Sequence, residues 1–372
     1  MFRNDSVRGA WYVVRGLATR ICVRHRLRLR TTHHALLLVG TLLLSFGGCS
    51  RDHRTPLVIY SPHGRDLLTL FERRFEARHP DVDVRWLDMG SQEVLDRIRS
   101  ERANPQADVW FGGPSLIFAL AARDSLLDCH RASWADAIAP RSRGPGDCYF
   151  ATYETPAVFL YPESLLTHAE APQDWDDLLD PRWKGKLIIR DPLASGTMRA
   201  VWGFILSRSV RETGDTTAGF AYLRRLDGQT KEYLQNPALV SEKIARQEAL
   251  VTVWDLPDVL ISRRRGMPIG YVFPRSGTVV IEDGIAVIRG SKRLEVARAF
   301  VDFAGSPEMQ LAAAREVYRV PARLDLPVDS LPDWVREVRR QMVVADVDWN
   351  LLAEQGPGWM RWWDQHVRGT GR

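Results

Sequence analysis

The segment LVIYSPHGRDLLTLFERRFEARHP, residues 57–80, decides the fold class of this chain. Four apolar residues predict a short strand, the turn at 61–64 follows, and leucine and phenylalanine then recur at helical spacing. The pattern continues with strand-like segments at 82–87 and 107–111, separated by an amphipathic helical segment around 94–98. This β-α-β-α-β order predicts a parallel sheet whose ligand-binding loops lie at the carboxyl ends of its strands.

The second half of the chain repeats the alternation of strands and helices. Two later segments, 269–273 and 284–288, are predicted to be strands that return to the first domain, which requires chain crossings near 152–156 and 273–278. We therefore expect an α/β protein of two lobes, each a mostly parallel sheet flanked by helices, with a two-crossing hinge. The expected boundaries are lobe 1 at 49–155 and 274–330, lobe 2 at 156–273, and a C-terminal helical tail at 331–372.

The expected tail is rich in tryptophan. We expect these side chains to pack the tail onto a lobe, because aromatic residues at helical spacing are more often core than ligand contacts. The sequence Gly356-Pro357-Gly358 is expected to break the last helix. The tryptophans are Trp334, Trp349, Trp359, Trp362 and Trp363.

An apolar run at 35–46 follows an arginine-rich segment and precedes Gly47-Gly48-Cys49. This run is too short to span a bilayer as a helix and has the form of a signal-peptide core. We expect residues 1–48 to be a signal peptide and Cys49 to carry a lipid, as in bacterial lipoproteins. The alternative is a core helix with an incidental cysteine.

Removal of the leader changes the charge balance. The whole chain has a formal charge of +5, and residues 1–48 contain eight arginines and one acid, a charge of +7, which leaves −2 for the rest. A slightly acidic chain with scattered basic residues argues against nucleic acid as a partner. Cys129 and Cys148 then remain, and an oxidising compartment permits a disulfide between them. Two buried free thiols are the alternative.

Four segments carry a family resemblance over residues 57–324. They are Tyr60-Ser61-Pro62-His63, the stretch PQADVWFGG at 105–113, the stretch WDDLLDPRWKGK at 175–186, and Ser195-Gly196-Thr197. Together they resemble the type 2 periplasmic solute-binding proteins of ABC importers, in particular the branch of ferric-iron-binding proteins and their relatives for phosphonates, sugar phosphates and polyamines. The resemblance implies a two-lobed periplasmic-binding-protein fold.

Two glycine-containing turns before predicted helices are the first candidates for the binding site. Ser195-Gly196-Thr197 and Gly90-Ser91 present free backbone N–H groups and the positive end of a helix dipole, an arrangement that favours anions. One turn belongs to each lobe, so the pair is expected to hold one anion between them. Ordinary helix capping by Ser195 or Thr197 is the alternative reading.

Other candidate ligand-binding residues lie at the ends of predicted strands. Ser61, His63, Gly112 and Gly113 are expected to form a cleft wall, although a solvated turn histidine is the commoner role for His63. Trp254-Asp255 is expected to stack on and hydrogen-bond a solute, with core packing as the alternative for Trp254.

The iron-binding pattern is not reproduced by this sequence. The resemblance implies two adjacent tyrosines at a position where this chain has Leu256-Pro257, and an acidic ligand where it has Gly113. We therefore expect no metal site, while Asp255, Asp258 and His63 remain a possible non-standard iron set.

No enzyme motif is recognised: HExxH, GxSxG and a phosphate loop ending in Gly-Lys-Ser/Thr are missing from the sequence. We expect a monomeric, lipid-anchored protein of the periplasm or cell envelope that needs no cofactor. It would capture a small, anionic or anion-accompanied solute and deliver it to an ABC permease in the membrane. A ferric-iron carrier, a solute sensor and an enzyme on the same fold are the alternatives.

Overall fold

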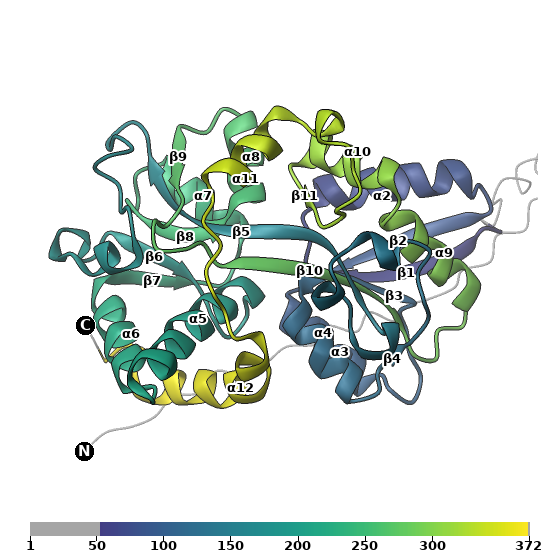
Figure 1. The fold of residues 1–372 in the computed structure, drawn as a ribbon, viewed down its shortest axis with the longest axis horizontal. Coiled ribbons are helices and arrows are strands. Elements are labelled where there is room, and N and C mark those ends of the chain that lie inside the picture. The colour runs from purple at the N-terminus through teal and green to yellow at the C-terminus, as the bar shows by residue number, and fades with distance from the viewer. Residues whose placement is uncertain (1–52, 371–372) are drawn as a thin grey trace, which may run out of the picture. The chain divides into compact units, whose positions relative to one another are not determined.

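The computed structural model describes residues 53–370 of the 372-residue chain. The predicted signal peptide and Cys49 lie outside the described residues. The rest of the chain, from Arg54 onward, forms one compact unit, in which two groups of elements lie side by side and are joined by the long strands β5 and β10 (Figure 1). Within the described part no helix is long and apolar enough to cross a membrane.

Lobe 1 is built on the alternating pattern that opens the chain. Parallel ladders join β1 to β2 and β1 to β3, as the β-α-β-α-β order predicts. The amphipathic helix α2 buries Leu67, Leu68, Phe71 and Phe75 because leucine and phenylalanine recur on one helical face. The elements are β1 (Thr55–Ser61), α2 (Arg65–Arg78), β2 (Val82–Asp88), α3 (Ser91–Ser100), β3 (Val109–Pro114), α4 (Ser115–Arg123) and β4 (Leu127–Asp128).

Lobe 2 is assembled around the second half of β5. Strands β8 and β9 pair antiparallel with β5, while β6 and β7 form a parallel pair beside them. The elements are β6 (Leu187–Arg190), α5 (Gly196–Thr213), α6 (Thr217–Gln229), β7 (Thr230–Leu234), α7 (Ala238–Ala245), β8 (Thr252–Asp255), α8 (Leu256–Arg264) and β9 (Ile269–Val272).

Two strands carry the chain between the lobes. In β5 (Phe150–Pro162), residues 150–156 pair with β10, and residues 157–162 pair with β8 and β9. Strand β10 (Val280–Ile288) lies between β5 and β3 and is antiparallel to both. The two-lobed α/β fold is therefore present, and its sheet is mixed because the crossing strands run against the parallel strands. We propose lobe boundaries at 155/156 and 273/274, which the change of partner along β5 supports.

The chain after β10 first completes lobe 1. Helix α9 (Leu294–Ala304) buries Phe300 and Val301 in the lobe 1 core, and α10 (Pro307–Val317) contributes Met309 and Ala313 to the same core. The two-residue strand β11 (Val320–Pro321) then pairs with β5.

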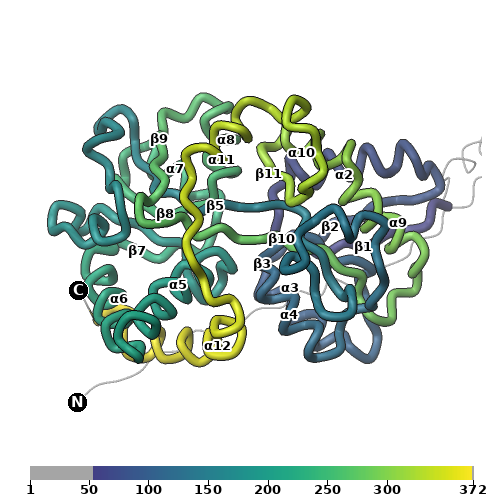
Figure 2. The backbone as a smooth tube through the Cα atoms, viewed as in Figure 1, coloured from purple at the N-terminus to yellow at the C-terminus, as the bar shows by residue number. Residues whose placement is uncertain are grey.

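The C-terminal tail packs on lobe 2. Helix α11 (Asp333–Gln341) buries Val335 and Val338 in a cluster with lobe 2 residues. The connecting segment forms a bridge between Val344 and Thr278 beside the second crossing and can be followed in Figure 2. Helix α12 (Trp349–His366) packs against α5 and also contacts α4 of lobe 1.

The expected break at Gly356-Pro357-Gly358 is wrong. Pro357 lies inside α12, which continues from Trp349 to His366. A proline in a helix interior costs about 3 kcal/mol, and the buried side chains of Leu352, Met360 and Trp363 on the packed face offset that cost.

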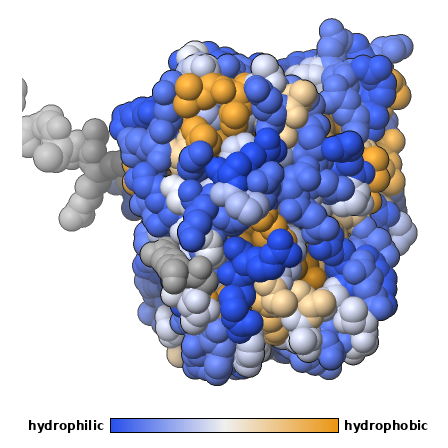
Figure 3. All heavy atoms as spheres, turned by 90° about the vertical axis from the view of Figure 1, so that its left-hand side faces the viewer, coloured by the Kyte–Doolittle hydropathy of each residue, from blue (hydrophilic) through white to orange (hydrophobic). Residues whose placement is uncertain are grey.

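The exposed face of lobe 2 in Figure 3 is largely hydrophilic, with smaller apolar areas.

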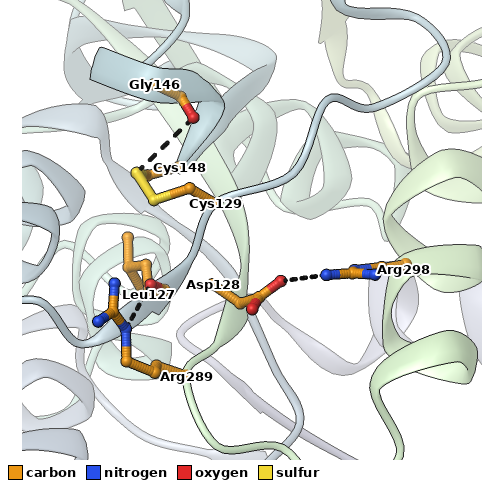
Figure 4. Close-up of a disulfide and its surroundings, with 7 residues drawn as sticks. All are labelled: Leu127, Asp128, Cys129, Gly146, Cys148, Arg289 and Arg298. Carbon is orange, nitrogen blue, oxygen red and sulfur yellow. Dashed lines mark hydrogen bonds and ion pairs between the residues drawn. A yellow bond between two sulfur atoms is a disulfide. The ribbon is translucent and has the colours of Figure 1, made fainter.

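The structure joins Cys129 and Cys148 in a disulfide (Figure 4). The bridge lies directly after β4, whose Asp128 forms an ion pair with Arg298 of α9. It closes an irregular segment that contains three short 3-10 helices. A covalent link is useful here because such a segment has few ladder hydrogen bonds of its own.

Candidate functional site

A cavity of about 460 Å³ is lined by residues of both lobes. Nine of the eleven predicted ligand-binding residues line it: His63, Gly90, Ser91, Gly113, Ser195, Gly196, Thr197, Trp254 and Asp255. Their convergence follows from the topology, since the turns after β1, β2, β3, β6 and β8 all lead to this cavity. The other two predicted residues, Ser61 and Gly112, lie behind its wall.

Ser61 and Gly112 shape the wall without lining the cavity. The Ser61 hydroxyl donates to the carbonyl of Phe111 (2.6 Å) and accepts from the backbone N–H of His63 (3.1 Å), which fixes the turn after β1. Gly112 has a φ of +105°, and a Cβ there would lie 2.4 Å from Nε2 of His63. Glycine is therefore required for the imidazole to pack against this backbone.

His63 is buried, so the reading as a solvated turn histidine is wrong. Its side chain is 5% exposed, and its ring lies edge-on to Phe111. Burial, together with the positive charge of Arg319, holds the pKa of His63 well below its usual value, so the imidazole is neutral at neutral pH. Nε2 is buried without a hydrogen-bond partner.

The starts of α3 and α5 meet at the cavity. The Ser195 hydroxyl accepts from the backbone N–H of Met198 (3.2 Å), so the capping interpretation holds for this helix. A Cβ on Gly196 would lie 2.6 Å from Cδ of Pro114 and 2.9 Å from Oγ of Ser91. The two helix starts are therefore in close contact, and glycine at position 196 allows that approach.

Asp255 lies at the end of β8 beside the start of α5. Its Oδ2 accepts a hydrogen bond from the hydroxyl of Thr197 (3.1 Å), while its Oδ1 is buried without a partner. Burial is the main cause that raises the pKa of Asp255 well above its usual value, and the neighbouring Asp258 raises it further. Trp254 is 4% exposed and belongs to a core cluster while also lining the cavity. The core-packing interpretation therefore holds, and stacking on a solute stays a prediction.

Asp258 and Asp283 also line the cavity; the sequence analysis named Asp258 only as a member of a possible iron set and missed Asp283. Asp283 of β10 accepts from the backbone N–H of Gly113 (3.1 Å) and from the hydroxyl of Thr155. Burial raises the pKa of Asp283, and it likewise raises that of Asp258 in α8. The proximity of Asp283 to Asp255 depends on the antiparallel place of β10 between β3 and β5, which sequence spacing does not reveal.

Arg319 is the missed residue with the clearest chemistry. It follows Tyr318, whose φ of +54° ends α10 and turns the chain toward β11. The Arg319 side chain lines the cavity and is 4% exposed. Its Nε has no hydrogen-bond partner, and no carboxylate of residues 53–370 forms an ion pair with it. A buried guanidinium without a partner is costly unless a ligand satisfies it.

The residues named for a non-standard iron set do not assemble into a metal site. Within the described residues no group of three His, Cys, Asp or Glu side chains is arranged to hold a metal ion. His63 faces the backbone of Gly112, whereas Asp255 is engaged by Thr197 at the start of α5.

Comparison with known proteins agrees with this architecture. The chain is 26% identical over 324 residues to a probable ABC transporter periplasmic-binding protein of Sinorhizobium fredii, covering 84% of this chain and 86% of that protein. It is 27% identical over 265 residues to a putative 2-aminoethylphosphonate-binding periplasmic protein of Salmonella typhimurium, covering 69% and 75% of the two chains.

A solved structure shows the same arrangement of lobes. It is a periplasmic binding protein of Actinobacillus pleuropneumoniae with fructose-6-phosphate bound, which matches with a TM-score of 0.73 at 25% identity. The match covers 85% of this chain and 99% of that one. Residues 73–337, more than half of the chain, match the family of bacterial extracellular solute-binding proteins. The chain belongs to this family of bacterial extracellular solute-binding proteins.

Proposed function

We propose that this protein captures a small solute with an anionic group in the cavity between its lobes and delivers it to an ABC permease. The observation that carries the proposal is the guanidinium of Arg319, which is buried at the cavity without a protein partner. An oxoanion accepts two parallel hydrogen bonds from such a group, and backbone N–H groups at the nearby helix starts add donors.

The names of two relatives support an anionic solute. One is described as binding a phosphonate, and the solved neighbour was obtained with a sugar phosphate bound. Because the cavity has walls from both lobes, a bound solute contacts both and stabilises their closed arrangement. A permease that recognises the closed arrangement then receives loaded protein in preference to free protein.

A thermal-shift screen tests the proposal. The probes are inorganic phosphate, 2-aminoethylphosphonate, fructose-6-phosphate, ferric ion and spermidine. An anion at one hundred times its dissociation constant is expected to stabilise the protein by about 2.7 kcal/mol. Arg319→Gln is expected to abolish that shift, whereas Arg361→Gln on the exposed face of α12 retains it. Stabilisation by ferric ion or spermidine alone would contradict the anion assignment.

The protein that binds the solute-loaded form distinguishes transport from solute sensing. We expect the loaded wild-type protein to bind a permease encoded beside it, and we expect no turnover of any probe that binds. Binding to a signalling receptor instead of a permease favours the sensor, and conversion of a probe favours an enzyme.

The proposed export and lipid anchor depend on the predicted signal peptide, residues 1–48, and on Cys49. We propose that Cys49 becomes the lipidated N-terminus of a monomeric periplasmic or envelope protein. Cys49→Ala is expected to leave the chain unprocessed or release it from the membrane fraction, which fractionation and intact mass measure. An unchanged mass and an unchanged membrane fraction would show that Cys49 carries no lipid.

A further inference from the structure

Three side chains at the cavity have buried polar atoms without a hydrogen-bond partner in the described protein. They are Nε of Arg319, Oδ1 of Asp255 and Nε2 of His63. They come from the turn between α10 and β11, the end of β8 and the turn between β1 and α2. The residues Arg319 and Asp255 line the cavity, so a donor with a positive charge and an acceptor with a potential negative charge both belong to its wall. An anion satisfies Arg319 and leaves Asp255 unsatisfied.

The carboxylates near Arg319 outnumber it. Asp255, Asp258 and Asp283 all line the cavity, and Arg319 acts electrostatically on each of them. Asp283 already accepts from Gly113 and Thr155, and the side chain of Trp254 is hydrogen-bonded to Asp258. Oδ1 of Asp255 is therefore the acceptor that remains for a ligand, with the carboxyl group of Asp258 as its neighbour.

The other arginines that line the cavity do not correct this imbalance. Arg265 forms an ion pair with Asp66 (2.6 Å). Arg190 donates to the carbonyl of Leu234 (2.9 Å). Arg65 also lines the cavity, and none of the three forms an ion pair with Asp255 or Asp258 in the described residues. Arg265 and Arg319 act on Asp258 only through longer-range electrostatics, so the acidic pair has no direct ionic partner there.

These charges constrain the solute. A purely anionic molecule at Arg319 opposes ionisation of the two neighbouring carboxyl groups, because like charges at short range in a cavity of low dielectric repel. A neutral hydroxyl satisfies Oδ1 of Asp255 without balancing the charge of the pair. An ammonium group does both, because it donates up to three hydrogen bonds and carries the opposite charge. The raised pKa values of Asp255 and Asp258 fall when such a cation binds.

We propose that the solute is a small zwitterion whose oxoanion group binds Arg319 and whose ammonium group binds Asp255 and Asp258. This proposal rests on the proposed function, since it assigns the class of solute that the same cavity captures. The volume of about 460 Å³ is suited to a small molecule.

Calorimetry with matched probe pairs tests the ammonium group directly. The pairs are 2-aminoethylphosphonate with propylphosphonate, and phosphoethanolamine with propyl phosphate. In each pair a methyl group replaces the ammonium and the anion stays the same. At least one zwitterion is expected to bind at least thirtyfold more tightly than its partner. Equal affinity within both pairs would overturn the proposal.

Variants assign the two ends of the solute. In Asp258→Asn and Asp255→Asn the advantage of the zwitterion is expected to fall to a few-fold, while the ammonium-free probe keeps its affinity. Arg319→Gln is expected to weaken both probes of a pair. Glu163→Gln, whose carboxylate pairs with Arg263 outside the cavity, is expected to keep the full difference. An advantage unaffected by both aspartate variants would overturn the assignment of the ammonium site.

Failure of this inference is distinguishable from failure of the proposed function. Binding of fructose-6-phosphate or inorganic phosphate without binding of either zwitterion contradicts the zwitterion and leaves anion capture standing. If none of the anionic probes binds to folded wild-type protein, the zwitterion and anion capture are both contradicted.

Discussion

Arg319, Asp255 and His63 each have a polar atom that is buried without a partner. Unsatisfied buried polar groups cost about 1–3 kcal/mol each, so the free protein is less stable than a version with an apolar or satisfied cavity would be. Such a cost is usual at binding sites, where the ligand supplies the missing interactions. Stability and solute affinity are therefore expected to change in opposite directions at these positions.

Asp255→Asn is expected to stabilise the ligand-free protein at neutral pH. The folded-state pKa of Asp255 is raised, so between the unfolded and folded pKa values the folded state holds a proton that the unfolded state lacks. Stability consequently falls as pH rises through this window, and the neutral amide removes that loss. The expected gain is about 1 kcal/mol at pH 7, diminishing as the pH is lowered toward the unfolded pKa. Thermal unfolding across pH measures it.

The matched control is Glu163→Gln on the exposed surface. Its free energy of unfolding is expected to stay within about 0.5 kcal/mol of that of wild type at each pH. A lower melting temperature for Asp255→Asn at pH 7 would show that the carboxylate stabilises the free protein, which contradicts the prediction.

The sequence indicated the site residues that follow strands and begin helices. Gly90, Ser91 and Ser195 to Thr197 were predictable because glycine and hydroxyl residues before an amphipathic segment are a local signal. Arg319 lacks such a signal, since it is one arginine between apolar residues, and its burial depends on the left-handed turn at Tyr318. Asp283 likewise lacks a local signal, since it follows Glu282 in an otherwise apolar strand, and its role depends on pairing with β3 across the chain.

At the scale of elements, the opening strands and helices of lobe 1 follow from periodicity, whereas the tail does not. The prediction of a break at Pro357 was wrong because local propensity was weighed without the burial of Met360 and Trp363 against lobe 2. Tertiary packing overrides the cost of an interior proline when enough apolar surface is buried. The return of 284–288 to lobe 1 was predicted and is confirmed, whereas the expected return of 269–273 is wrong, because β9 pairs with the lobe 2 half of β5. The antiparallel pairing was not evident, because pairing partners are far apart in sequence.

We expect loss of the Cys129–Cys148 disulfide to lower the free energy of unfolding. Replacing both cysteines with serine removes a link between residues 19 positions apart, and the chain-entropy relation gives a loss of about 3 kcal/mol. Denaturant unfolding of the double variant measures this loss, with reduced wild-type protein as the matched reference. Two alkylatable thiols in the native, exported protein would instead show that the bond is not formed.

Arg368, just after α12, is expected to order the loop that leads to the start of α5. It forms an ion pair with Asp191, whose Oδ1 accepts from the backbone N–H of Leu193 (2.8 Å). The backbone carbonyl of Asp191 accepts from the N–H of Ser195 (2.9 Å). Arg368→Ala leaves a buried carboxylate with fewer donors, so amides at 191–197 are expected to lose protection from hydrogen exchange.

The comparison for Arg368→Ala is Arg361→Ala, which changes an exposed arginine of α12. We expect the protection of 191–197 to be unchanged in that variant. Equal protection in Arg368→Ala and wild type would show that the tail does not order the loop. Weaker solute binding is the expected functional effect of a loosened loop.

At the scale of the whole described unit, a rim ion pair links the lobes. Arg265 at the end of α8 contacts Asp66 in the first turn of α2. The arginine side chain is 58% exposed, so the pair is expected to contribute no more than about 1 kcal/mol.

Arg265→Gln is therefore expected to weaken solute binding by at most about fivefold, through a smaller population of the closed arrangement. The effect is expected to vanish near 1 M salt, where exposed charges are screened. Arg263→Gln is the control, because its partner Glu163 belongs to the same lobe. Calorimetry at low and high salt compares the solute affinities of the two variants. A loss of affinity in Arg265→Gln that persists at high salt would show that the Arg265–Asp66 ion pair is not its cause.

The position of β10 between β3 and β5 has a consequence for how the chain acquires its structure. Ile285 pairs with Phe111 and also with Phe150, so an interior strand of the lobe 1 sheet is made only after all of lobe 2. Residues 156–273 are contiguous and are free to fold early, while lobe 1 must wait for its missing strand. Non-local pairing of this kind slows folding and keeps strand edges exposed. A chain with this topology thus spends its longest vulnerable interval with lobe 2 folded and the lobe 1 sheet still open.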